Sequence, residues 1–125
     1  MILFTYGTLK RGYWNNHFLS NSKYLGEGDT SEKYMVYYES YPFAVHSSNV
    51  KEGECLPIHG ELYEVDNSTL SVLDVLETGY ERKTRPIITS DGVINAFVYE
   101  WPFATPFGIT QTCLPENNKY EWKES

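Results

Sequence analysis

Near its start the chain carries Ile2-Leu3-Phe4-Thr5-Tyr6-Gly7-Thr8-Leu9-Lys10-Arg11-Gly12, the most informative stretch of the sequence. Its apolar start predicts a buried strand, and Gly7 marks the point where the strand gives way to a tight turn. Successive backbone N–H groups in such a turn converge on one point and can bind a carboxylate or a phosphate. No Gly-Lys-Ser/Thr sequence follows, so the stretch does not match a nucleotide phosphate loop. It therefore predicts a small anion-binding turn.

Beyond this turn, the sequence predicts a strand-dominated α+β domain with one clear helix. Runs rich in apolar residues and tyrosine predict strands at 23–29, 33–38, 41–45, 58–65, 82–89 and 93–99. A brief helical turn is expected at 16–19. Asp91-Gly92 between two apolar runs is typical of a hairpin, and Gly60 within a strand indicates a bulge or the close approach of a neighbour. We expect the sheet to curl into a barrel, with the segment after Trp101 lying over its body.

Composition indicates a single domain spanning residues 1–125 and excludes several classes of partner. The net charge of −7 repels phosphate backbones, so no nucleic-acid partner is expected. No apolar run approaches the roughly 20 residues that a membrane span needs, and no signal pattern precedes the first strand, so we expect a cytoplasmic protein without a membrane partner. The oligomeric state is left open. The basic residues that come nearest to clusters are expected to be solvated surface charges and are Lys10, Arg11, Lys83 and Arg85.

The predicted helix carries a carboxylate on its apolar side. Its leucines recur at helical spacing, at Leu70, Leu73 and Leu76, and the polar residues 66–69 offer an N-cap. At about 100° per residue, Glu77 falls between Leu70 and Leu73 on the helical wheel. We therefore expect Glu77 to point toward the core.

The position of Glu77 has two interpretations. Burial and the negative end of the helix dipole both disfavour the ionised carboxylate, so its pKa should rise toward neutrality, as general acid/base catalysis requires. Alternatively, Glu77 lies at the rim of the apolar face and pairs with Arg82 or Lys83. The anion-binding turn favours the first interpretation, an acid/base enzyme that acts on a small anionic substrate.

Histidine and cysteine residues offer little support for other chemistries. His17, His46 and His59 are too far apart in sequence to form a local ligand pair, so no metal site is predicted. A nucleophilic pair of Cys55 with His59 lacks an identifiable orienting partner. Cys55 and Cys113 fit inert thiols or a single disulfide.

Several short blocks of the sequence match the motifs of one known family. A further segment, Tyr41-Pro42-Phe43, matches one branch of that family. The blocks occur in the order Tyr6-Gly7-Thr8-Leu9-Lys10-Arg11-Gly12, Gly60-Glu61-Leu62-Tyr63, Leu73-Asp74-x-Leu76-Glu77, Tyr80-x-Arg82 and Ala96-Phe97-Val98-Tyr99. Taken together, they make the chain resemble the gamma-glutamylcyclotransferase superfamily between Ile2 and about Tyr99. The branch is that of the gamma-glutamylamine cyclotransferases.

This resemblance implies a small barrel flanked by helices, with neither a metal nor an organic cofactor. It implies the release of 5-oxoproline and a free amine from a small-molecule gamma-glutamyl amine or gamma-glutamyl peptide, with Glu77 as the catalytic acid/base. The residues that it implies for holding the substrate are Tyr6, Gly7, Thr8, Leu9 and Tyr80.

Two other classes of function remain as alternatives. The same pocket would serve a non-catalytic module that binds a gamma-glutamyl or related anionic amino-acid derivative, because folds outlive their chemistry. A tyrosine-rich surface would also suit a structural or interaction protein. The leaving amine is left open, and we expect segments 41–45 and 101–108 to form the outer pocket that selects it.

Overall fold

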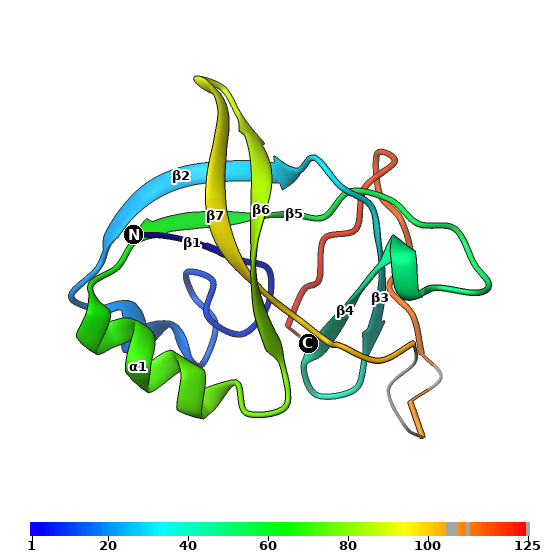
Figure 1. The fold of residues 1–125 in the computed structure, drawn as a ribbon, viewed down its shortest axis with the longest axis horizontal. Helices are drawn as coiled ribbons and strands as arrows, with labels where there is room; N and C mark the ends of the chain where they lie inside the picture. Colours follow the sequence, from blue (N-terminus) through cyan, green and yellow to red (C-terminus); the bar gives the residue numbers. More distant parts are fainter. Residues whose placement is uncertain (105–107, 110, 125) are drawn as a thin grey trace.

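The computed structural model describes residues 1–104, 108–109 and 111–124. Its elements follow in the order β1 (Ile2–Thr5), η1 (Asn16–Leu19), β2 (Lys23–Thr30), β3 (Tyr34–Tyr38), β4 (Pro42–His46), η2 (Ser47–Asn49), β5 (His59–Glu64), α1 (Asn67–Leu76), β6 (Glu81–Thr89) and β7 (Gly92–Glu100). Five strands close a barrel in the order β1-β5-β2-β6-β7, while β3 and β4 pair separately. Figure 1 shows α1 beside one end of the barrel and the β3–β4 sheet at the other side. The predicted α+β barrel with one main helix is confirmed, and its short flanking helices are 3₁₀ turns.

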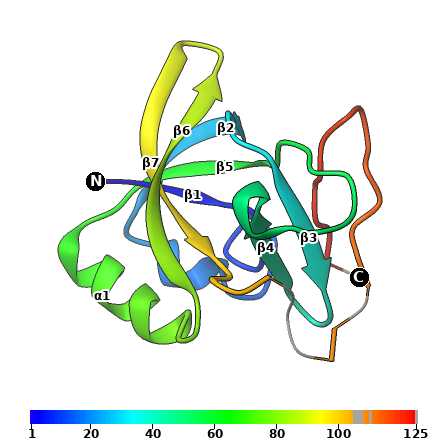
Figure 2. The ribbon, with the colours of Figure 1, turned by 45° about the vertical axis from the view of Figure 1, so that its right-hand side comes forward.

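The barrel closes through β1, which lies antiparallel to β5 and parallel to β7, with Leu3 opposite Phe97. The β6–β7 hairpin turns where predicted, with Thr89 opposite Gly92 and a positive φ of 114° at Gly92. A glycine tolerates this conformation because it has no Cβ. The hairpin extends well beyond the barrel, as both ribbon views show (Figures 1 and 2).

Apolar side chains form one core inside the barrel and a second beneath α1. Asp66 caps the helix, since its carboxylate accepts a hydrogen bond from the Thr69 backbone N–H at 2.7 Å. Leu70 and Leu73 are buried as expected, but Leu76 is 38% exposed. On the helical wheel, Leu76 is about 120° from Leu70, which turns it away from the second core.

Gly60 lies where β5 crosses the start of the chain closely. A Cβ at this position would lie 2.4 Å from the Thr5 carbonyl oxygen and 2.7 Å from the Phe4 ring. The close approach expected from the sequence is therefore confirmed, and it holds β5 against β1.

The C-terminal segment lies over the body of the protein, as expected. Tyr120 pairs with Ile58, and the carbonyl of Trp122 accepts a hydrogen bond from the Lys10 Nζ at 2.6 Å. Lys10 is only 5% exposed, so its prediction as a solvated surface charge is wrong. It is buried because this segment, distant in sequence, covers it.

Cys55 and Cys113 are both free thiols. In the described part of the chain, no helix is long and apolar enough to cross a membrane.

Candidate active site

A cavity of about 320 Å³ opens between the loop after β1, the end of α1 and the start of β4. We call it the Glu77 cavity. The six predicted site residues all line it and are Tyr6, Gly7, Thr8, Leu9, Glu77 and Tyr80. The loop at residues 6–9 and the end of α1 at residues 77–80, about 70 positions apart in sequence, therefore line the same cavity.

The loop after β1 lines this cavity and carries backbone N–H groups without a partner among the described residues. Among the hydrogen bonds of the described residues, none is donated by the backbone N–H of Gly7, Thr8 or Leu9. The loop is held from outside by Asn15, whose side-chain amide donates to the Thr8 Oγ1 at 2.9 Å and whose backbone N–H donates to the Thr8 carbonyl at 3.0 Å. Three N–H groups in a fixed loop can stabilise a carboxylate or an oxyanion.

Gly7 allows this loop to lie against β4. A Cβ at Gly7 would lie 2.9 Å from the Cγ of Pro42, closer than such carbon atoms approach in proteins. The absence of a side chain therefore sets the width of the cavity at this wall.

Glu77 caps the C-terminus of α1, is half-buried and lines the cavity. Burial raises the pKa of the Glu77 carboxyl to about 7. The alternative partners of Glu77 pair elsewhere: Arg82 pairs with Asp74 at 3.3 Å, and Lys83 pairs with Glu81 at 2.6 Å. The alternative of a paired rim carboxylate is therefore wrong for this structure.

The raised pKa of Glu77 makes stability depend on pH. Between the ordinary value of 4.5 and about 7, the folded protein binds more protons at this carboxyl than the unfolded chain does, so the free energy of unfolding falls as pH rises through this window. Glu77→Gln removes the titration. Measured by urea denaturation, the stability of the variant relative to the wild type should rise by on the order of 2 kcal/mol between about pH 4 and about pH 8. The same difference at both pH values would contradict this assignment.

Tyr80 is positioned by the turn that follows the helix. Gly79 has a φ of 101°, and the Tyr80 hydroxyl donates to the Pro42 carbonyl at 2.7 Å. The Tyr80 ring stacks on Phe43 with centroids 5.8 Å apart. Helix end and β4 are thereby joined across the cavity.

Tyr6 and Tyr80 share one electronic property. Burial raises the pKa of both phenols, so both stay neutral. The Tyr6 hydroxyl donates to the Tyr99 carbonyl at 2.5 Å, just as Tyr80 donates to Pro42. With its single proton already donated, each phenol oxygen can only accept a hydrogen bond from a ligand.

The outer part of the cavity differs from its prediction in one segment. Tyr41 and Pro42 line it as expected, but none of the described residues of segment 101–108 does, and residues 105–107 lie outside the described residues. Trp14 and Asn15 form this wall instead. Their position just after the first turn was the only signal in the sequence that could have identified them.

Histidine and cysteine residues do not assemble a competing site in the described part of the chain. No group of three or more His, Cys, Asp or Glu side chains there could hold a metal ion. Burial raises the pKa of the Cys55 thiol, and His59 contacts Asp29 at 2.7 Å and Glu27 at 3.3 Å. A raised thiol pKa disfavours the thiolate that nucleophilic catalysis needs.

Residues 3–124 match the model of the family described as gamma-glutamyl cyclotransferase, AIG2-like. The chain belongs to this family. The match extends past Tyr99 and includes the C-terminal segment that covers Lys10.

The chain aligns with most of the length of its relatives in this gamma-glutamyl cyclotransferase family. A protein of Methanocaldococcus jannaschii, provisionally named a gamma-glutamylcyclotransferase, is 40% identical over 105 residues, which cover 80% of this chain and 83% of that protein. The gamma-glutamylcyclotransferase family protein YtfP of Escherichia coli is 33% identical over 103 residues, or 82% of this chain and 85% of YtfP. The crystal structure of an AIG2-like protein from Mus musculus superimposes with a TM-score of 0.70 at 25% identity, covering 99% of this chain and 97% of that one.

Proposed function

We propose that the protein is a cyclotransferase that releases 5-oxoproline and a free amine from a gamma-glutamyl amine or gamma-glutamyl peptide. One observation carries this proposal. The half-buried Glu77 carboxyl, with a pKa of about 7, lines the same cavity as the N–H groups of Gly7, Thr8 and Leu9. An acid/base and an oxyanion-binding loop are the two parts that this reaction needs.

The reaction is an intramolecular aminolysis. The alpha-ammonium of the substrate first loses one proton through Glu77 to solvent. The freed amine nitrogen then attacks the gamma-carbonyl carbon to close a five-membered ring, and it gives up its second proton to Glu77 as the ring forms. The carbon–nitrogen bond to the leaving amine then breaks, and Glu77 returns the proton to that amine. Since nucleophile and electrophile belong to one molecule, the protein contributes mainly by holding a reactive conformer.

The phenol oxygens of Tyr6 and Tyr80 complete the binding of the substrate's ammonium group. Each can only accept a hydrogen bond, because its own proton is donated to a backbone carbonyl. An ammonium group has three donors and no acceptor, so Glu77 and the two phenols match it. The loop N–H groups are then left for the alpha-carboxylate and the developing oxyanion.

The leaving amine extends toward Trp14 in this proposal. The Trp14 side chain is 52% exposed and lines both the Glu77 cavity and a second cavity of about 520 Å³. A substituent on the leaving nitrogen therefore has room beyond the reacting centre, which fits gamma-glutamyl amines.

The test is to incubate the protein with a panel of gamma-glutamyl amines and peptides and to measure 5-oxoproline release against pH. For the best substrate, kcat/KM should fall about tenfold per pH unit below about pH 7, because protonated Glu77 cannot accept a proton. Tight binding of the panel without turnover would replace this proposal with that of a non-catalytic binding module.

A further inference from the structure

The end of β7 contacts both the loop after β1 and helix α1, which lie on different sides of the Glu77 cavity. The carbonyl of Tyr99 accepts a hydrogen bond from the Tyr6 hydroxyl at 2.5 Å, and Tyr6 begins the loop after β1. The hydroxyl of Tyr99 donates to the Asp74 Oδ1 at 2.7 Å, on α1 and three residues before Glu77. Any displacement of this residue would move the loop relative to the helix end.

The residue after β7 extends this connection to β4. The Trp101 backbone N–H donates to the Ala44 carbonyl at 2.8 Å. The Trp101 indole packs edge-on against both Tyr80 and Phe43, with centroids 5.6 Å and 5.2 Å apart. Residues 99 and 101 therefore contact every wall of the cavity that carries a proposed functional group.

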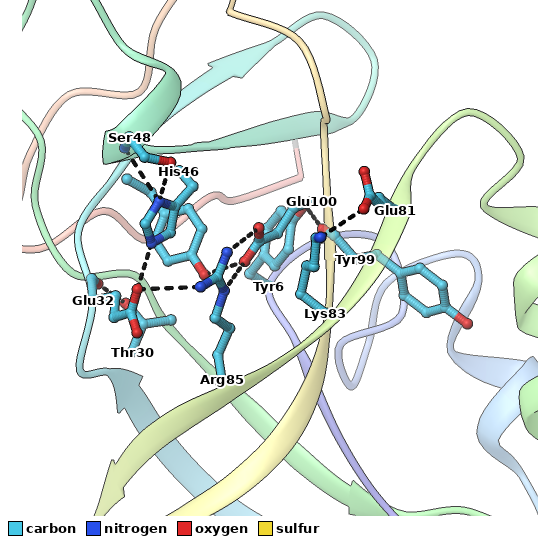
Figure 3. A network of polar contacts seen from close by, with 11 residues as sticks. Tyr6, Thr30, Glu32, His46, Ser48, Glu81, Lys83, Arg85, Tyr99 and Glu100 are labelled. Carbon is cyan, nitrogen blue, oxygen red and sulfur yellow. Dashed lines mark hydrogen bonds and ion pairs between the residues drawn. The ribbon is translucent and has the colours of Figure 1, made fainter.

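Glu100, between them, is buried and forms an ion pair with the half-buried Arg85. Its side chain is 5% exposed, and its two carboxylate oxygens accept from the Arg85 Nε at 2.7 Å and Nη2 at 2.9 Å. The fully buried Tyr34 donates its hydroxyl to the same carboxylate at 2.5 Å. Figure 3 shows the Arg85 guanidinium between Glu100 and Glu32, which it also contacts at 3.3 Å. The prediction of Arg85 as a solvated surface charge is therefore wrong, because β7 brings a buried carboxylate beside it.

Stability alone does not explain this arrangement. Removing the Glu100 carboxylate from water costs several kcal/mol, and apolar replacements of such ion pairs are often neutral or stabilising. What a bidentate pair supplies is fixed geometry, because the planar guanidinium matches both carboxylate oxygens. The pair fixes β7 at the residue that lies between Tyr99 and Trp101.

We propose that Arg85 and Glu100 are positioning residues for the reaction. Their pair fixes the end of β7, so that the Tyr99 carbonyl holds Tyr6 and the Trp101 indole supports Tyr80 at the angles that bind the substrate's ammonium group. The kinetic part of this inference rests on the proposed cyclotransferase function.

The test replaces the buried polar group as a whole, in the variant Tyr34→Phe/Arg85→Met/Glu100→Leu. Tyr34 is included because its buried hydroxyl would otherwise lose its acceptor. We expect a folded protein whose kcat falls about tenfold to 100-fold, because a misplacement of about 1 Å costs up to that factor. KM should rise as well, because the same displacement weakens the contacts of Tyr6 and Tyr80 with the ammonium group. A folded variant with the kcat of the wild type would overturn the proposal.

A matched control lies on the same strand. Glu81 and Lys83 form an exposed pair at 2.6 Å, drawn beside the Arg85–Glu100 pair in Figure 3. The variant Glu81→Leu/Lys83→Met should keep kcat within about twofold of the wild type, because neither residue lines the cavity and an exposed pair contributes little. An equal loss of kcat in the control would show that β6 substitutions act nonspecifically and would also overturn the proposal.

Two further measurements test the positioning role even if the triple variant does not fold. Arg85→Lys keeps the charge without the bidentate geometry, so kcat should fall about threefold to tenfold even if the triple variant does not fold. The amide ¹H–¹⁵N shifts of residues 7–9 should move in Arg85→Lys and stay in place in the control. If the wild type shows no turnover, the cyclotransferase proposal fails while these shifts still test the positioning role. Unchanged shifts in Arg85→Lys would refute that role.

Discussion

Replacing Glu77 with glutamine should lower 5-oxoproline release by about 100-fold or more while the protein remains folded. Glutamine keeps the size and shape of the side chain but cannot take a proton from the substrate's ammonium group. Initial rates on the best substrate of the gamma-glutamyl panel, with circular dichroism to check the fold, measure this effect. The loss should appear in kcat, because the loop N–H groups of residues 7–9 remain free to bind the substrate.

A nearby carboxylate provides the control for this substitution. Glu81 is exposed and pairs with Lys83 on β6. Glu81→Gln should leave the rate within about twofold of the wild type. If Glu77→Gln retains the full rate, Glu77 is structural and the proposed mechanism is wrong.

Replacing Gly60 with alanine should destabilise the protein by about 3 kcal/mol or more, the upper range for overpacking. The added Cβ would lie 2.4 Å from the Thr5 carbonyl oxygen, a backbone atom that cannot move away without shifting β1. Urea denaturation measures the loss. Because β1 leads into the loop at Gly7, we also expect weaker substrate binding.

A second variant separates the two contacts of that Cβ. Phe4→Leu in the Gly60→Ala background removes the ring that would lie 2.7 Å away but leaves the Thr5 carbonyl in place. Stability should therefore recover only in part. Complete recovery would mean that the ring alone, and not the backbone of β1, limits this position.

Local patterns account for much of the fold and for the members of the candidate site. Turn and cap signals act over a few residues and can therefore be recognised in the sequence, as at Gly7, the Asp91-Gly92 hairpin and the Asp66 cap. The inward side of Glu77 follows from helical periodicity alone. The catalytic and binding roles of these residues remain predictions.

The tertiary structure decided what depends on segments far apart in sequence. Lys10 and Arg85 look like ordinary surface charges in sequence, yet Trp122 covers the first and Glu100 pairs with the second. Trp14 enters the cavity wall only because the loop after β1 folds back toward β4.

The sequence by itself thus determined the strands, the turns, the helix and the side of the helix on which the carboxylate of Glu77 lies. Only the tertiary structure decided which charges are buried and which distant residues line one cavity. The physical reason is range: turn chemistry and periodicity depend on neighbouring residues, whereas burial and pairing depend on which distant segments the barrel brings into contact.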